Sequence, residues 1–424
     1  MIFLVTSSAK SSQFGAEDYS YYFVLKHFIP ILEKLGLVVE LDDAEDVDRI
    51  YRQVSSFGVG CIFLCFSPPH KTVSGLECPT IPVFAWEYGT IPNEVWSSNT
   101  KNNWVIELQK YVAAITHSEH TVSVTKQEIG EAFPITSIPA PIWGQYSRYF
   151  NVQADLSLDV KSNINVNGWV LDSADFKGSF ERRSNEKTEQ SVTLSGVVYT
   201  SIFTPNDGRK NWQDLLTAYC YTFSGIGDVT LVLKLTHTDP KYCFDVIYKE
   251  LNKLLPFSCR VVVIQGFLPD EDYVKLMATT KYSVNSSFGE GQCLPLMEYM
   301  SAGKPSIAPS HTGMEGYIRR SNSFVVESSK QWTHWPHDPR QLLRTFRQQI
   351  NWDSLCAAYL SSYQEIKNNP DAYRHRSHQA HLDLKQHCSD LQTQKKLKSV
   401  FSEVRKNSRI RQRLTYPIYS AAWF

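Results

Sequence analysis

Short apolar runs alternate with stretches of helical length along the chain, and this alternation limits the folds open to it. In the first third of the sequence the apolar runs are residues 2–6, 37–41, 61–66, 81–86 and 113–118. Strands that alternate with helices build a parallel sheet covered by helices on both faces. Residues 1–150 are therefore predicted to form one doubly wound, Rossmann-like α/β domain.

A second alternation of the same kind begins near Ser191. Its apolar runs are residues 192–199, 229–235, 261–265, 282–285 and 306–309, with helical stretches at 212–223, 242–255, 270–279 and 294–302. A chain of 424 residues is long enough for two such domains. Residues 191–380 are therefore predicted to form a second Rossmann-like domain.

Two other segments do not follow this alternation. The polar stretch 151–190 is predicted to be an insertion or linker between the domains, and its Asn167-Gly168 pair indicates a hairpin turn. The chain from about Gln331 is predicted to be helical. Its last part, residues 381–424, is predicted to form a C-terminal helical tail that packs back on the first domain.

Composition excludes several classes of protein. Lys and Arg together number 43, as do Asp and Glu, whereas binding to a nucleic-acid backbone needs a surplus of positive charge. The nine cysteines have no metal-binding spacing, so neither a zinc site nor a disulfide framework is predicted, and a reducing, cytoplasmic setting fits them. No apolar run reaches the roughly 18 residues of a membrane span, and the first residues lack the basic start of a signal peptide.

The segment 286–305 holds the residues that most strongly indicate a ligand. Glu290 lies on a loop between Gly289 and Gly291, where the absence of side chains lets a ligand approach the backbone. Glu298 lies one turn inside the helix that is predicted to follow. The two carboxylates can then bind hydroxyl groups on different parts of one ligand. The alternative is a pair of surface glutamates near the start of a helix.

Between the two glutamates lies the N-terminus of that helix, which favours an anion. Pro295 suits the first helical turn, where a missing N–H group costs nothing. Free backbone donors at this end, together with the helix dipole, attract a group such as a diphosphate. The predicted donors are the amides of Gln292, Cys293 and Leu294. Hydroxyls at both ends and phosphates between them describe a nucleotide-sugar.

The same string resembles the signature of the retaining glycosyltransferases of family 4, which have the GT-B fold. The matching positions are Ser287, Glu290, Gly291, Leu294, Pro295, Glu298, Met300, Gly303 and Pro305, with Cys293 in place of the usual second glycine and Tyr299 in place of alanine. The resemblance covers residues 191–318 and implies two Rossmann-like domains that face each other across a cleft. It also implies that Glu290 contacts the donor sugar, that Glu298 contacts the nucleotide ribose, and that the amides after Gly291 hold the diphosphate.

Two further donor-side elements follow from the resemblance. Arg209 and Lys210 lie on the loop before the helical stretch 212–223, where the family carries cations that neutralise the leaving diphosphate. The family spaces its Arg and Lys several residues apart, whereas here they are adjacent, and a solvated basic turn is the alternative. Phe267 and Leu268 match the family segment that borders the nucleotide base, and ordinary turn packing is the alternative there.

The resemblance assigns the acceptor to the first domain. The family carries a glycine-rich loop after its first strand, for which this chain offers Gly15. Many members have a histidine near the reacting carbon, whereas this chain has Trp86 and Glu87. Glu87 could orient an acceptor hydroxyl, act as a base or cap its own loop. His117 and His120, beside a predicted strand end, are further candidates, with ordinary packing as the alternative.

The sequence thus predicts a retaining glycosyltransferase that moves a sugar from a nucleoside-diphosphate sugar to a hydroxyl of a glycan, lipid-linked or protein acceptor in surface polysaccharide or glycoconjugate biosynthesis. No metal or cofactor is implied, because cations and a helix N-terminus handle the diphosphate. The basic segment 405–413 is either a solvated helix end or a peripheral contact with the inner face of a membrane. The alternatives are a nucleotide-sugar epimerase or a sugar phosphorylase of the same fold, and a non-catalytic subunit that binds a nucleotide-sugar.

Overall fold

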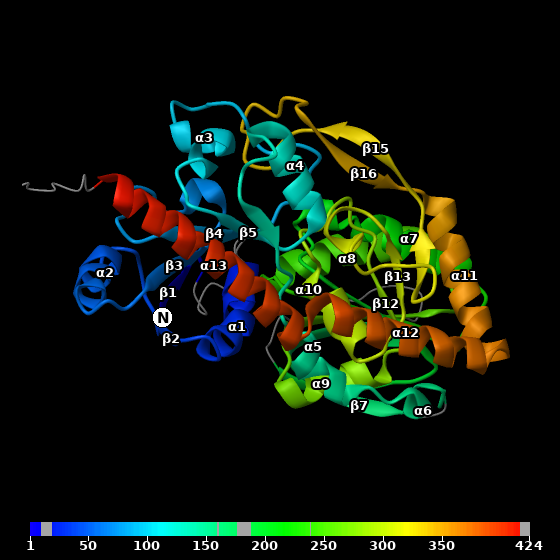
Figure 1. Ribbon diagram of the computed structural model, residues 1–424. Coiled ribbons are helices and arrows are strands. Elements are labelled where there is room, and N and C mark those ends of the chain that lie inside the picture. The colour runs from blue at the N-terminus through cyan, green and yellow to red at the C-terminus, as the bar shows by residue number, and fades with distance from the viewer. Residues whose placement is uncertain (10–18, 159–160, 176–187, 238, 416–424) are drawn as a thin grey trace, which may run out of the picture.

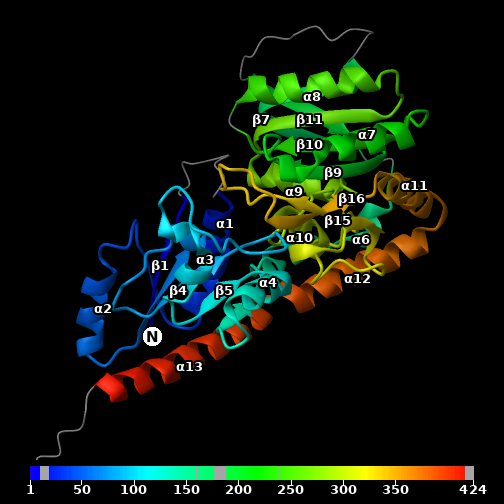
Figure 2. The ribbon, with the colours of Figure 1, turned by 90° about the horizontal axis from the view of Figure 1, so that it is seen from above.

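The structure is a computed structural model that describes residues 1–9, 19–158, 161–175, 188–237 and 239–415. Two α/β units lie side by side, each built on its own sheet, and the last helices run from the second unit back along the first (Figures 1 and 2). The predicted fold class, two Rossmann-like domains followed by C-terminal helices, is confirmed.

The first sheet has six parallel strands in the order β2-β1-β3-β4-β5-β6. These strands are β1 (Ile2–Ser7), β2 (Leu37–Glu40), β3 (Cys61–Phe66), β4 (Thr80–Phe84), β5 (Ala114–Thr116) and β6 (Ile135–Ser137). All six residues of β3 are buried, as expected for a central strand covered on both faces. The accompanying helices are α1 (Tyr19–Glu33), α2 (Val47–Ser56), α3 (Trp104–Leu108), α4 (Glu119–Ile129) and α5 (Trp143–Tyr146).

The second sheet has eight strands in the order β14-β13-β12-β9-β10-β11-β7-β8, of which the first six are parallel. These six are β9 (Val197–Phe203), β10 (Val229–Leu235), β11 (Arg260–Phe267), β12 (Tyr282–Val284), β13 (Ser306–Pro309) and β14 (Ser323–Val326). The helices of this unit are α6 (Val152–Asp155), α7 (Trp212–Thr222), α8 (Pro240–Leu254), α9 (Asp270–Thr279) and α10 (Leu294–Ser301).

The predicted hairpin turn at Asn167-Gly168 is wrong. The chain runs straight through this pair as β7 (Ser162–Asp172), which pairs antiparallel with β11. Gly168 is needed there for a different reason, because a Cβ atom on it would lie 2.2 Å from the carbonyl oxygen of Gln265. The glycine therefore permits a close approach of two strands and does not reverse the chain.

The predicted single strand at 192–199 is also wrong, because it is divided between β8 (Thr188–Leu194) and β9. Gly196 breaks the run with a φ of 77°, and a Cβ atom on it would lie 2.3 Å from the carbonyl oxygen of Asp228. β8 pairs with β7 at the edge of the sheet, whereas β9 lies in its middle. An apolar run alone does not show such a break.

The prediction of helix from about Gln331 fails for the first part of that segment. β15 (Ser328–Thr333) and β16 (Thr345–Ile350) form an antiparallel pair that docks on the first unit. The backbone N–H groups of Gly89 and Thr90 donate to the carbonyl oxygen of Phe346, at 2.9 Å, and to the hydroxyl of Thr345, at 3.1 Å. Contacts with the other unit therefore decide the conformation of this segment, and its own sequence pattern does not show them.

Three helices complete the chain: α11 (Trp352–Asn368), α12 (Pro370–Cys388) and α13 (Asp390–Thr415). In Figure 2, α13 extends along the first unit. The rings of Phe3 and Phe401 lie 4.8 Å apart, and Lys396 donates to the carbonyl oxygen of Ser137 at 2.8 Å. The last helix therefore ties the two units together.

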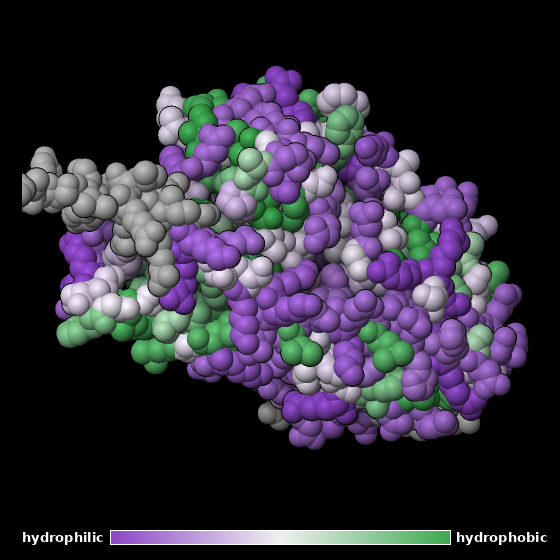
Figure 3. Space-filling model, viewed as in Figure 1, coloured by the Kyte–Doolittle hydropathy of each residue, from purple (hydrophilic) through white to green (hydrophobic). Residues whose placement is uncertain are grey.

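The face shown in Figure 3 is largely hydrophilic, with apolar side chains in several small, separate groups. Among the described helices, none is long and apolar enough to cross a membrane.

Replacing Gly168 by alanine is expected to lower the free energy of unfolding by at least ~2 kcal/mol, because the new Cβ would force β7 away from β11. Urea denaturation measures this loss. Gly225→Ala is the matched control, since a Cβ there meets no atom within 4 Å. Equal stability of the two variants would contradict the close approach of the strands.

Candidate active site

Three loops meet at the carboxyl ends of parallel strands, which is where ligands bind in open α/β sheets. Two belong to the second unit and follow β9 and β12, and the third follows β4 of the first unit. The backbone N–H of Phe288 donates to the carbonyl oxygen of Arg209 at 2.8 Å, which fixes the first two loops to each other. Asn211 ends its loop in the left-handed conformation, with φ 48°, and donates to the carbonyl oxygen of Ser286.

Glu290 is buried at the centre of these loops and is held by cations and neutral donors. Lys210 donates to its carboxylate at 2.7 Å, Arg209 at 3.2 Å, Ser287 at 2.6 Å and Asn285 at 3.1 Å. Burial alone would raise the pKa of Glu290, but the two cations and the hydrogen bonds lower that pKa to about 2. Glu290 is therefore ionised at neutral pH and forms ion pairs with both basic residues. The sequence assigned these three residues to one donor site but did not predict that they contact each other.

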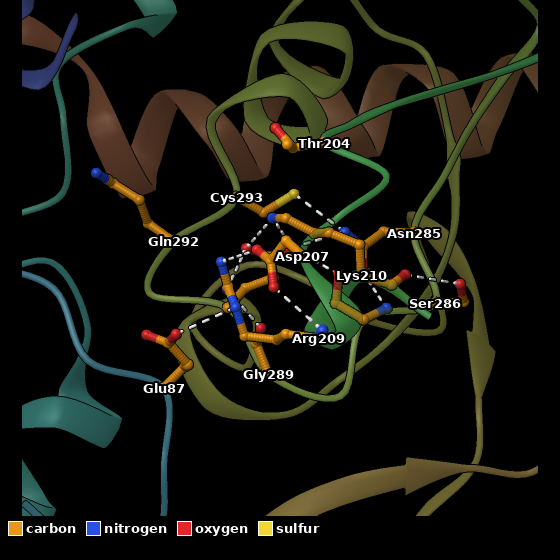
Figure 4. Close-up of polar contacts among 12 residues, drawn as sticks. Glu87, Thr204, Asp207, Arg209, Lys210, Asn285, Ser286, Gly289, Gln292 and Cys293 are labelled. Atoms are coloured by element: carbon orange, nitrogen blue, oxygen red, sulfur yellow. Dashed lines mark hydrogen bonds and ion pairs between the residues drawn. The ribbon is translucent and has the colours of Figure 1, made fainter. Parts of the chain in front are cut away.

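Arg209 is surrounded by carboxylates from both units (Figure 4). Its guanidinium contacts Asp207 at 2.9 Å, Glu290 at 3.2 Å and Glu87 at 3.2 Å, and it also donates to the carbonyl oxygen of Gly289 at 2.8 Å. Burial would lower the pKa of Arg209, but the carboxylates raise it far above its usual value. Glu87 reaches this cluster from the loop after β4, so the contact joins the two units.

The glycines of the loop after β12 allow the units to touch. A Cβ atom on Gly289 would lie 3.0 Å from the carbonyl oxygen of Glu87, and one on Gly291 would lie 2.7 Å from the Cβ of Ala85. The sequence predicted that these glycines let a ligand approach the backbone, whereas in the structure the loop after β4 makes that close approach. A larger residue at Gly291 would force these loops apart.

The residues at the start of α10 face in different directions. The Gln292 side chain accepts a hydrogen bond from the backbone N–H of Ala140 at 3.0 Å, so it contacts the first unit (Figure 4). Cys293 precedes the helix in the left-handed conformation, with φ 59°, and its thiol lies 3.3 Å from the amide nitrogen of Asn285. Leu294 is the first helical residue.

Glu298, half-buried on α10, has a different environment from Glu290. Its carboxylate accepts hydrogen bonds from the hydroxyls of Tyr273 on α9 and Tyr146 on α5. Burial raises the pKa of Glu298 to about 7, and the two hydroxyls only partly oppose this. Glu298 is thus a carboxyl group that exchanges its proton near neutral pH, already engaged by two tyrosines.

Several other predicted site residues do not join this cluster. Trp86 is buried in the first unit, packs on Trp104 at 4.6 Å between ring centroids and donates to the carbonyl oxygen of Thr90. Leu268 is buried in the apolar core beside β7 and α9. Phe267 ends β11, but its side chain lies outside what the structure describes, as does the whole of Gly15.

The two histidines lie away from the cluster around Glu290, and each bonds to a backbone carbonyl group. His117 is buried and bonds to the carbonyl oxygen of Ile138 at 3.0 Å, and burial lowers its pKa to about 4. His120 bonds to the carbonyl oxygen of Tyr88 at 3.0 Å. Residues 405 and 406 are exposed on α13, and the side chains of 407–413 lie outside the description.

Sequence reasoning missed three polar residues that build the site. Asp207 accepts from the N–H of Arg209, Asn285 donates to Glu290, and the Thr312 hydroxyl accepts from the N–H of Glu290 at 3.0 Å. Each lies just after a strand, so polar residues at strand ends were the available signal. Within the described residues, no group of three or more His, Cys, Asp or Glu side chains could hold a metal ion.

Comparison with known proteins gives a likeness in structure and not in sequence. No family model matches the sequence, and no curated protein matches it. A glycosyltransferase from Rickettsia africae superposes with a TM-score of 0.58 at 11% identity, covering 96% of this chain and 98% of that one. HepE from Anabaena, in complex with UDP and glucose, gives 0.55 at 10% identity, with 95% and 100% covered. Sucrose-phosphate synthase from Thermosynechococcus elongatus gives 0.55 at 12% identity, with 96% and 99% covered.

The chain has the GT-B fold. Against TarM from S. aureus the TM-score is 0.49, and the chain spans only 55% of that longer protein. In this GT-B protein, the cluster of Arg209, Lys210, Glu290, Asp207 and Glu87 lies where the two domains meet.

Glu298→Gln is expected to flatten the pH dependence of stability. The folded pKa of about 7 lies above the ordinary 4.5, so the folded protein holds a proton that the unfolded chain has lost. This stabilisation is complete below pH 4.5 and is lost as the pH rises through about 7.

Denaturation is measured at about pH 5 and at about pH 8. Between these two pH values, the free energy of unfolding of the wild type should fall by about 2 kcal/mol more than that of Glu298→Gln. Glu271→Gln, which removes an exposed carboxylate of α9, should lose as much as the wild type. Equal losses in the wild type and Glu298→Gln would contradict the assigned environment.

Proposed function

We propose that the protein is a glycosyltransferase whose donor is a nucleoside-diphosphate sugar. The observation that carries this proposal is the pairing of Lys210 and Arg209 with Glu290 at the carboxyl ends of β9 and β12, beside the N-terminus of α10. Two half-buried cations next to a helix N-terminus suit a diphosphate, and an anchored carboxylate suits sugar hydroxyls. The UDP and glucose in the HepE structure, which has the same fold, support this assignment.

In the proposed reaction the cations stabilise the departing nucleoside diphosphate. The bond between the anomeric carbon and the phosphate oxygen breaks, and a bond from that carbon to the acceptor oxygen forms on the same face of the sugar. The acceptor hydroxyl gives its proton to the leaving phosphate. Lys210 and Arg209 neutralise the developing charge, which is the main electrostatic task of such a step. The configuration of the sugar is retained, and the chain's own cations take the place of a metal.

The remaining donor contacts are assigned by position. Glu290, fixed by its cations, is proposed to hold hydroxyls of the donor sugar. Glu298 is proposed to hold the ribose once Tyr273 and Tyr146 release it. Amides at the start of α10, after Gly291, would complete the diphosphate site.

The acceptor is proposed to be a glycan, a lipid-linked sugar or a protein in surface polysaccharide or glycoconjugate synthesis. It would bind on the first domain, on the side of Glu87. The setting is proposed to be cytoplasmic, with the basic segment 405–413 as a peripheral contact to the inner membrane face. A pull-down with vesicles of anionic and of neutral lipid distinguishes this contact from a solvated helix end.

Lys210→Gln is expected to reduce turnover about 100-fold or more, because it removes one of the two charges that stabilise the leaving group. UDP-, GDP-, dTDP- and ADP-sugars are first screened for binding by calorimetry, and turnover is then followed as release of the nucleoside diphosphate. Glu290→Gln should lower turnover as well.

Lys253→Gln, which changes an exposed lysine on α8, is the control and should retain wild-type turnover. Failure of every nucleotide-sugar to bind the wild type would refute the proposal. Epimerisation of the donor without any acceptor would favour an epimerase instead.

A further inference from the structure

The cations around Arg209 are already fully neutralised by carboxylates, so they carry no spare positive charge for a diphosphate. Two cations, Arg209 and Lys210, face three carboxylates, those of Glu87, Asp207 and Glu290. All five groups are partly or fully buried, where an unbalanced charge is costly. A ligand that brings further negative charge to these cations must therefore displace one of the carboxylates.

Glu290 and Asp207 are both fixed in place. Glu290 accepts hydrogen bonds from four side chains, and its two cations keep its pKa low despite its burial. Asp207 lies two residues from Arg209 on the same loop, where its side chain also accepts the backbone N–H of Arg209 at 3.1 Å. Displacing either one would break the loop that carries the cations.

Glu87 is held less firmly than the other two carboxylates. It reaches the cluster from the opposite domain, where its carboxylate forms an ion pair with Arg209 at 3.2 Å. Burial raises the pKa of Glu87, and the nearby Glu290 and Asp207 add to this, while Arg209 and Lys210 oppose it. The anionic form of Glu87 is thus less favourable in its present position than that of Glu290, whose pKa is lowered.

The backbone around Glu87 is anchored by hydrogen bonds, whereas the carboxylate is held by its ion pair with Arg209. The backbone N–H groups of Gly89 and Thr90 bond to β16 at 2.9 Å and 3.1 Å. A Cβ atom on Gly289 would lie 3.0 Å from the carbonyl oxygen of Glu87, 3.2 Å from its Cβ and 3.4 Å from its Cγ, so the base of the side chain also packs on this loop. Rotation about the last side-chain bonds of Glu87 can therefore release Arg209 without any movement of the loop.

We propose that Glu87 is an internal substitute for the donor diphosphate, which takes over Arg209 on binding and frees the Glu87 carboxylate to receive the acceptor hydroxyl. This inference rests on the proposed function. Arg209 stays paired throughout, because the diphosphate replaces the carboxylate at the same guanidinium. The freed carboxylate faces the first domain and accepts a hydrogen bond from the acceptor. Binding is then ordered, with donor first and acceptor second, and Glu87 acts as a positioning residue.

The test measures affinity for inorganic pyrophosphate and for the nucleoside diphosphates UDP and GDP by calorimetry in the wild type and in Glu87→Gln. The variant keeps the size of the side chain but cannot compete as an anion, so at least one of these ligands should bind about tenfold more tightly. Turnover of the nucleotide-sugar should fall while its KM also falls. A purely structural role would weaken binding.

Glu94→Gln is the matched control, because Glu94 also forms ion pairs across the domains, with Arg340 at 3.0 Å and Arg344 at 2.9 Å, away from the cluster. It should leave both affinity and turnover as in the wild type. If Glu87→Gln does not fold, Glu87→Asp shortens the reach to Arg209 and should shift affinity in the same direction.

Binding to the wild type with no gain in the Glu87 variants would overturn this inference and leave the proposed function standing. Absence of binding to the wild type by pyrophosphate and by every nucleotide would overturn both together. Equal gains in Glu87→Gln and Glu94→Gln would also overturn the inference, since the effect would then come from loosening the domains.

Discussion

The ion-pair cluster around Arg209 is the constraint on which the site depends. A buried charge is tolerated only when it is paired and hydrogen-bonded, so each of the five charged groups requires the others in place. The partners come from loops after β4, β9 and β12, which must therefore be fixed relative to each other. Glycines at 289 and 291 permit that approach, and the contacts of β16 and α13 with the first domain maintain it.

Two glutamates that look alike in the sequence have opposite electrostatic surroundings. Glu290 stays ionised because two cations outweigh its burial, whereas Glu298 is engaged by two tyrosine hydroxyls and burial raises its pKa to about 7. Both are already occupied by groups of the chain itself: Glu290 by Lys210 and Arg209, and Glu298 by two tyrosines. Side chains of the protein therefore occupy the groups that are assigned to the donor. We expect that a donor must first displace some of these side chains when it binds.

Local sequence patterns predicted most of the fold and pointed to the loops that meet at the site. The apolar runs located the parallel strands because burial on both faces requires them, and the loop after β12 brought Glu290 to Lys210 as the strand-end rule requires. Contacts between distant segments escaped prediction. The pairing of β15 with β16, the path of β7 past Gly266 and the reach of Glu87 to Arg209 depend on where whole units dock. Trp86 and Leu268 pack in the apolar cores. The local sequence does not show whether an apolar side chain beside a motif packs in a core or contacts a ligand.

The most direct test of the account is a crystal structure of the protein with the nucleoside diphosphate that binds it. The account predicts a phosphate oxygen within about 3 Å of Arg209 and of Lys210, with the Glu87 carboxylate turned away from the guanidinium and the Glu290 carboxylate unmoved. A nucleotide bound elsewhere, with the ion pair between Glu87 and Arg209 still intact, would contradict it.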